Sequence, residues 1–150
     1  MRDFQLPGRS PVFATEGMCA TSHPLAALTA IDILRRGGTA MDAAIAGAVM
    51  LGLCEPQMTG IGGDAFVLWT RAGSDEVRAL NGSGRAPAGA DAQALRDRGL
   101  SAVPVDGAEA VTIPGAIDAF CRLAATEGRL GIDALLAALI EAAERGVPVA

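Results

Sequence analysis

Residues 39–53 read TAMDAAIAGAVMLGL, and they dictate what must surround the helix they form. Thr39 followed three residues later by Asp42 matches a capping box, in which each side chain satisfies a backbone amide at the helix start. The residues after it are apolar around the whole helix, with Ala and Gly interspersed. Such a helix must be enclosed on most sides, and its small residues allow a neighbour to approach closely. We therefore expect helix 40–53 to lie inside a layered fold.

Further helices and strands are expected on both sides of this stretch. Ser22 and Pro24 are typical of an N-cap and a first-turn residue, and Gly37 is typical of a helix end, so a helix is expected over 24–36. Its apolar face is expected to consist of Leu25, Leu28, Ile31 and Leu34. Downstream, the pattern predicts a β-hairpin over 65–81 with strands 65–70 and 76–80, helices over 92–98, 116–126 and 133–145, and a short strand over 111–113.

Composition excludes several functional classes. The chain has 150 residues, a length that suits one domain or a piece of a larger one, and nothing in residues 1–150 marks an internal boundary. All 12 basic residues are Arg, so this stretch supplies no lysine for Schiff-base or phosphate-loop chemistry. A net charge of −5 and the absence of Tyr argue against a nucleic-acid partner.

No targeting, membrane or metal signal is expected from the residue pattern. Residues 1–13 lack the apolar core of a secretory signal, and the apolar run over 40–53 is shorter than the ~20 residues of a membrane span. A cytoplasmic location without membrane association is therefore expected. Cys19, Cys54 and Cys121 are far apart and accompanied by a single His, so we expect small buried side chains, with no metal and no cofactor.

Two glycine-rich loops, 60–64 and 81–87, are candidates for a functional site. Neither follows a strand and opens a helix, as a dinucleotide-binding loop would. Asp64 has two open interpretations, a functional acidic residue or ordinary turn chemistry. His23 lies four residues from Cys19, but no third group completes a catalytic arrangement, so a structural role is expected for it.

The order of several motifs resembles the γ-glutamyltransferase (γ-glutamyltranspeptidase) family. The motifs extend over residues 17–149 and include both glycine loops and the capping-box helix. They are GMCATSHPLA (17–26), ILRRGGTAMDAA (33–44), Glu55-Pro56, GIGG (60–63), RAP (85–87), IPG (113–115) and AAERGVPV (142–149).

The resemblance implies an α+β fold, the αββα four-layer sandwich of an N-terminal nucleophile hydrolase. The chain would be the N-terminal part of the large subunit of a precursor that cleaves itself. In this family a threonine at the start of the small subunit attacks an amide carbonyl and forms an acyl-enzyme. That threonine lies outside these residues, so no residue here is assigned a catalytic role. The implied partners are an amide substrate and the rest of the precursor with its small subunit, in a heterodimer or a dimer of heterodimers.

One departure from the family pattern bears on the substrate. Members that recognise a γ-glutamyl group have an arginine three positions before the Ala-Pro pair, where this chain has Ser83. Arg85 stands two residues later and is expected to anchor a substrate carboxylate, with Ser83 adding a hydrogen bond. The alternative is a loop arginine that satisfies local carbonyls. The loop is similar to the branch with oxamate amidohydrolase and cephalosporin-acylase-like proteins.

These observations lead to one expected function and two alternatives. We expect part of an amidohydrolase or acyltransferase that cleaves an amide of a small, oxamate-like carboxylate. One alternative is a γ-glutamyltransferase or glutathione hydrolase. The other is a non-catalytic structural or binding fragment.

Overall fold

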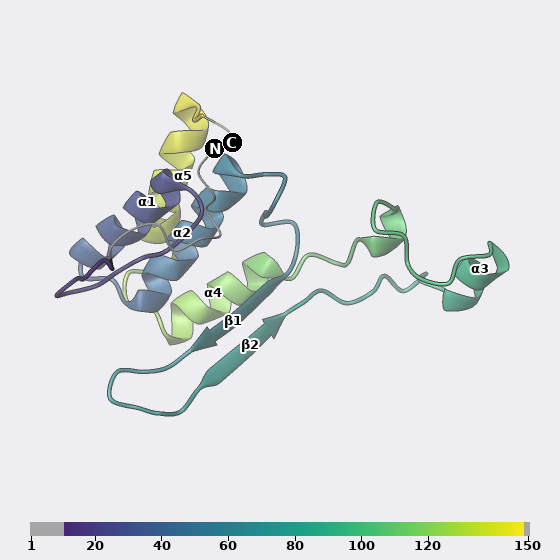
Figure 1. Ribbon diagram of the computed structural model, residues 1–150, viewed down its shortest axis with the longest axis horizontal. Coiled ribbons are helices and arrows are strands. Elements are labelled where there is room, and N and C mark those ends of the chain that lie inside the picture. The colour runs from purple at the N-terminus through teal and green to yellow at the C-terminus, as the bar shows by residue number, and fades with distance from the viewer. Residues whose placement is uncertain (1–10, 149–150) are drawn as a thin grey trace.

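The computed structural model describes residues 11–148 and shows helices gathered beside a two-stranded sheet, with an arm extending away from them (Figure 1). Residues 1–10, where no secretory signal is expected, and 149–150, the end of the last family-like motif, lie outside the described residues. The elements are α1 (Pro24–Arg35), α2 (Ala40–Cys54), β1 (Ala65–Trp69), β2 (Arg78–Gly82), α3 (Ala92–Asp97), η1 (Ala108–Ala110), α4 (Ala116–Thr126) and α5 (Ile132–Arg145).

Helix α2 is the centre of the helical layer, as expected. It contacts α1, α4 and α5, and most of its side chains are buried. The capping box is confirmed, because Asp42 N donates to Thr39 Oγ1 at 3.1 Å and Thr39 N donates to Asp42 Oδ2 at 2.8 Å. Small residues do permit close packing, since a Cβ placed on Gly47 would lie 3.5 Å from the carbonyl oxygen of Ala26 in α1.

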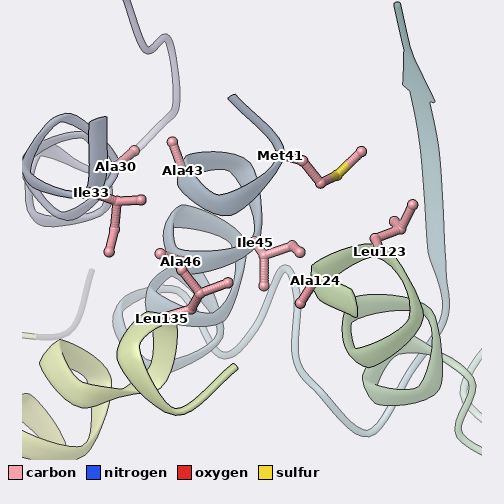
Figure 2. Close-up of a cluster of buried hydrophobic side chains, with 9 residues drawn as sticks. All are labelled: Ala30, Ile33, Met41, Ala43, Ile45, Ala46, Leu123, Ala124 and Leu135. Carbon is pink, nitrogen blue, oxygen red and sulfur yellow. The ribbon is translucent and has the colours of Figure 1, made fainter. Parts of the chain in front are cut away.

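The main core lies where four helices meet around the first half of α2 (Figure 2). Its members are apolar side chains, with Ile33 from α1, Ile45 from α2, Leu123 from α4 and Leu135 from α5 each at most 2% exposed. Burial of each large aliphatic side chain contributes about 1.5–3 kcal/mol to stability. The helices therefore form a packed layer that can support the loops at its edge.

The expected details of α1 are partly wrong. The N-cap is His23 and not Ser22, because the His23 Nδ1 accepts from Leu25 N at 3.2 Å. Ser22 Oγ instead donates to Glu55 Oε2 at 2.6 Å. The buried face also differs from the expected leucine face: it consists of Ala26, Thr29, Ala30 and Ile33. Leu28 is 59% exposed, because the close approach of α2 selects the small side chains of α1 for the interface.

The hairpin is confirmed, with a shift in its second strand. β1 and β2 are antiparallel, and Ala65 pairs with Gly82 while Trp69 pairs with Arg78. The second strand therefore covers 78–82 and not 76–80. The strand ends at Gly82, which lies close to α4. Only glycine fits there, because a Cβ on Gly82 would lie 2.7 Å from the Cβ of Ala119.

One face of the hairpin is covered by α4, and the other is open. α4 packs against β2, and Ala65 forms a small buried cluster with Ala116 and Ala119. On the opposite face Phe66 is 71% and Leu68 is 75% exposed. The sheet therefore has one partner layer within residues 11–148, on its α4 side.

Two further expectations need correction. Residues 111–113 do not form a strand, because Ile113 N donates to Arg85 O at 3.0 Å without a ladder of such bonds. The cysteines are all free, but only Cys54 is buried, while Cys19 is half-buried and Cys121 is exposed on the solvent side of α4.

Candidate functional site

Three loops meet at one end of the hairpin, and together they form the loop junction, defined here as residues 60–64, 82–86 and 111–115. The register places the start of β1 beside the end of β2, so the chain enters and leaves the sheet at the same place. The third loop joins them through Gly63 O, which accepts from Gly115 N at 3.1 Å and from Ala116 N at 2.9 Å. Both expected glycine loops thus lie at the first turn of α4.

Asp64 is the side chain that connects these loops. Its Oδ1 accepts from Gly84 N at 2.8 Å and from Thr112 Oγ1 at 2.9 Å. Its Oδ2 accepts from Ser83 Oγ at 3.3 Å. The Gly84 amide, followed by the hydroxyls of Thr112 and Ser83, lowers the pKa of the Asp64 carboxyl below its ordinary value, because each donor favours the charged form. Asp64 is therefore a carboxylate that accepts from two neighbouring loops.

Of the three glycines of the loop junction that have no room for a side chain, Gly84 and Gly115 lie closest to the backbone of a neighbouring loop. A Cβ on Gly84 would lie 1.7 Å from Ile113 O, and a Cβ on Gly115 would lie 2.3 Å from Gly82 O. Contacts this short do not occur between real atoms, so any larger residue would force the loops apart. The glycines thus allow the close backbone approach that brings Thr112 to Asp64.

Ser83 and Arg85, the predicted substrate-binding residues, both lie exposed on the middle loop of the junction. Asn81 Oδ1 accepts from Ser83 N at 2.9 Å, which fixes the turn after β2, and the Ser83 hydroxyl is engaged by Asp64. Arg85 is held through its backbone carbonyl by Ile113 N. Within residues 11–148 its guanidinium forms no hydrogen bond or ion pair, so the local carbonyls do not satisfy it.

The first glycine loop forms a tight turn. Gly63 N donates to Gly60 O at 3.3 Å, and a Cβ on Gly60 or Gly62 would meet nothing within 4 Å. The loop rests on the end of α2, since a Cβ on Gly52 would lie 3.3 Å from Gly60 Cα. This turn presents the Gly63 carbonyl to α4 and places Asp64 beside the middle loop.

The other polar candidates have structural contacts elsewhere. His23 caps α1, and Thr39 belongs to the capping box and donates to Glu127 O at 3.1 Å. Thr112 was missed by the sequence analysis, because its contact with Asp64 joins residues that are 48 positions apart. The only sequence signals for this pair were an acidic residue after Gly62-Gly63 and a hydroxyl before Ile-Pro-Gly.

A surface cavity of about 770 Å³ lies at the opposite end of β1, away from the loop junction. It is lined by the start of α2, by residues 67–72 and by Glu127 and Arg129. Arg71 forms a two-fold hydrogen-bonded ion pair with Glu127 there, with its Nε at 2.9 Å and its Nη2 at 2.7 Å from the two carboxylate oxygens. Of the charged groups that line this cavity, Arg71 and Glu127 are thus paired with each other, while Arg129 donates to the backbone carbonyl of Gly37 at 2.9 Å.

Neither a metal cluster nor a membrane span is found in the described part of the chain. No group of three or more His, Cys, Asp or Glu side chains there is arranged to hold a metal ion. No helix between residues 11 and 148 combines the length and the apolar character needed to cross a bilayer.

Comparison with known proteins shows a common family. The model of the family described as gamma-glutamyltranspeptidase matches residues 26–150. A glutathione hydrolase-like proenzyme of Bacillus subtilis is 36% identical over 141 residues, which are 92% of this chain and 26% of that protein. The oxamate amidohydrolase proenzyme of Klebsiella pneumoniae is 35% identical over 142 residues, covering 91% of this chain and 26% of that protein.

A solved structure gives the same result for the fold. The crystal structure of cephalosporin acylase from Bacillus halodurans matches with a TM-score of 0.84 and 45% identity, over 98% of this chain and 27% of that one. The expected α+β fold of an N-terminal nucleophile hydrolase is thereby confirmed, and the described residues correspond to a portion of its large subunit. The chain spans about a quarter of the length of these relatives.

Proposed function

The chain belongs to the gamma-glutamyltranspeptidase family, and on this premise we propose that it forms part of an amidohydrolase or acyltransferase for a small carboxylate-bearing amide. The observation that carries the proposal is Arg85, whose exposed guanidinium has no partner within residues 11–148 and stands on a loop held from two sides. A guanidinium in this state can form a two-fold hydrogen bond with a substrate carboxylate. Ser83, on the same loop, donates its hydroxyl proton to Asp64, so its oxygen can accept a hydrogen bond from the substrate amide N–H.

The chemistry proposed is acyl transfer through a threonine outside this chain. The threonine hydroxyl attacks the amide carbonyl carbon while the free α-amino group takes its proton. The amide C–N bond then breaks, the proton passes to the departing amine, and an ester on the threonine remains. Water or an acceptor amine attacks this ester, so that the acyl group leaves and the hydroxyl is restored. The residues described here bind and orient the acyl group.

The partner proposed is the rest of the precursor, including its small subunit, in a heterodimer or a dimer of heterodimers. Two observations support this proposal. The chain matches only about a quarter of each relative, and several of these relatives are named proenzymes. The sheet face that carries Phe66 and Leu68 is exposed, and an apolar face of this kind is usually covered in a complete protein. A cytoplasmic location stays a prediction.

The substrate proposed is an oxamate-like amide rather than a γ-glutamyl compound. In this chain Ser83 occupies the position of the γ-glutamyl-binding arginine, and the matches include oxamate amidohydrolase and cephalosporin acylase. The rival is glutathione hydrolysis, which the Bacillus subtilis relative's name favours. To separate them, kcat/KM for oxamate and for a γ-glutamyl anilide would be measured on the full-length enzyme. A much higher value for the anilide would overturn the argument from Ser83.

The non-catalytic alternative makes a different prediction. If residues 1–150 act alone as a binding or structural module, the isolated chain should be a soluble monomer with a sharp cooperative thermal transition. In that case neither amide should be consumed when the chain is present alone or in its natural context. Turnover of either amide by the full-length protein contradicts this alternative.

A further inference from the structure

We propose that Asp64 is a positioning residue for substrate binding, which holds the 83–85 segment against Thr112 and so sets where Arg85 meets the substrate carboxylate. This inference rests on the proposed function and adds a third residue to Arg85 and Ser83, outside the loop that contacts substrate. Asp64 does not itself contact the reacting atoms.

Asp64 is hydrogen-bonded to both of the loops that lie beside it. Gly84, one residue before Arg85, donates its amide to Oδ1 at 2.8 Å. Thr112, one residue before Ile113, donates its hydroxyl to the same oxygen at 2.9 Å. Ile113 N in turn donates to Arg85 O at 3.0 Å. Asp64 and Arg85 are therefore linked by two short routes, one through Gly84 and one through Thr112 and Ile113.

The position of Asp64 requires a group that only accepts hydrogen bonds, as an ionised carboxylate does. All three of its partners are donors, and an ionised carboxylate only accepts, whereas the amide of Asn would present its NH₂ to one of them. Asp64 and Arg85 form no ion pair with each other in the described part of the chain. Among residues 11–148, the ion pairs are formed by Arg71, Arg78, Arg98, Arg122 and Arg145. Arg85 has no ion-pair partner among these residues, so its guanidinium is available to an external carboxylate.

Few other contacts hold the 83–85 segment, so the loss of the Asp64 carboxylate should change the position of Arg85. Asn81 Oδ1 accepts from Ser83 N, but it belongs to β2 and does not reach the other loops. The Gly84 backbone passes so close to Ile113 that the loop tolerates no side chain there, but no hydrogen bond joins these two residues. Without the carboxylate, the 83–85 segment keeps a single hydrogen bond to the 111–115 loop.

The first test is steady-state kinetics of Asp64→Asn and Asp64→Ala in the full-length enzyme with the amide that the wild type prefers. A displaced Arg85 weakens ground-state binding of the carboxylate, so KM should rise about tenfold or more. The reacting threonine is on another segment, so kcat should change less than about threefold. Asp91→Asn is the matched control, because Asp91 also accepts a backbone amide at 2.8 Å, from Gln93, but does so at the start of α3 on the arm.

Substitutions of Thr112 provide a milder test, in which the hydroxyl is first removed and then restored. Thr112→Val removes one donor to Asp64 without a change of shape and should raise KM by a smaller factor. Thr112→Ser restores the hydroxyl and should restore KM. A KM unchanged in Asp64→Asn, or a rise matched by Asp91→Asn, would overturn the proposal.

Hydrogen exchange supplies a readout that does not depend on turnover. Exchange of the 82–85 backbone amides should be about tenfold faster in Asp64→Ala than in the wild type, while α2 amides keep their rate. Unchanged exchange at 82–85 means that Asp64 does not hold the loop, and the inference fails. If the wild type consumes no amide but exchange responds as expected, the proposed function has failed and the contact of Asp64 with the loop is upheld.

Discussion

Arg85 offers the most direct test of how a single side chain contributes to the proposed site. Arg85→Ala should lower kcat/KM for a carboxylate-bearing amide about tenfold or more, because a charge-assisted hydrogen bond contributes about 1.5–3 kcal/mol. Arg96→Ala is the matched control, since Arg96 is an exposed arginine on α3. Initial rates at several substrate concentrations measure the effect. Equal rates for the wild type and Arg85→Ala would remove Arg85 from the substrate site.

Gly84 shows how one missing side chain makes the loop junction possible. Gly84→Ala would place a Cβ 1.7 Å from Ile113 O, so the two loops must separate. We expect a loss of stability of about 1–3 kcal/mol, as in other overpacked sites, seen as a lower Tm by calorimetry of the full-length protein. Gly89→Ala, at a site with nothing within 4 Å, is the control and should leave Tm unchanged. A normal Tm in Gly84→Ala would contradict the observed loop arrangement.

The hairpin and α4 are joined at their far end by an ion pair whose strength depends on pH. Glu127 caps α4 and accepts from Arg71, and this hydrogen bond, with the nearby charge, lowers the pKa of the Glu127 carboxyl. Because the folded-state pKa is the lower one, the stabilisation is present above the unfolded pKa and is lost as the pH falls through the folded value.

The measurement for this pair is Tm as a function of pH in the wild type and in Glu127→Gln. The wild type should lose Tm more steeply than the variant as the pH falls below about 4.3, the ordinary Glu pKa. Near neutral pH the variant should have the lower Tm, since it lacks the pair. Glu144→Gln, at an exposed position of α5, is the control. Parallel Tm profiles of the wild type and Glu127→Gln would show that the ion pair does not stabilise this connection.

At the scale of the molecule, the helices within residues 11–148 leave one face of the sheet open. Phe66 and Leu68 are more than two-thirds exposed on that face, so residues 1–150 produced alone should self-associate. Phe66→Thr combined with Leu68→Thr should shift the chain toward monomer in light scattering, with an unchanged helical signal in circular dichroism. Val105→Thr, which removes an apolar side chain 89% exposed on the arm, should not. A wild-type chain that is monomeric at all concentrations would contradict this expectation.

Local patterns were sufficient to identify most of the helices and the hairpin. These features depend on residues that are close together in sequence, so the local pattern is enough to predict them. Examples are the capping box at Thr39 and Asp42, the small residues of α2 and the hairpin around Gly73. The ordered motifs likewise indicated the family, and Ser83 and Arg85 as candidates for the substrate loop.

Other features depend on contacts between distant segments. Leu28 was expected inside by its spacing, but α2 approaches closely enough that Ala26 and Ala30 occupy the interface instead. Asp64 was open to two interpretations because its partners lie 19, 20 and 48 residues away. Periodicity and capping depend on residues that are near in sequence, so the sequence alone predicts them. The packing of helix against helix and the meeting of three loops depend on segments that are far apart in sequence, so only the tertiary structure determines them.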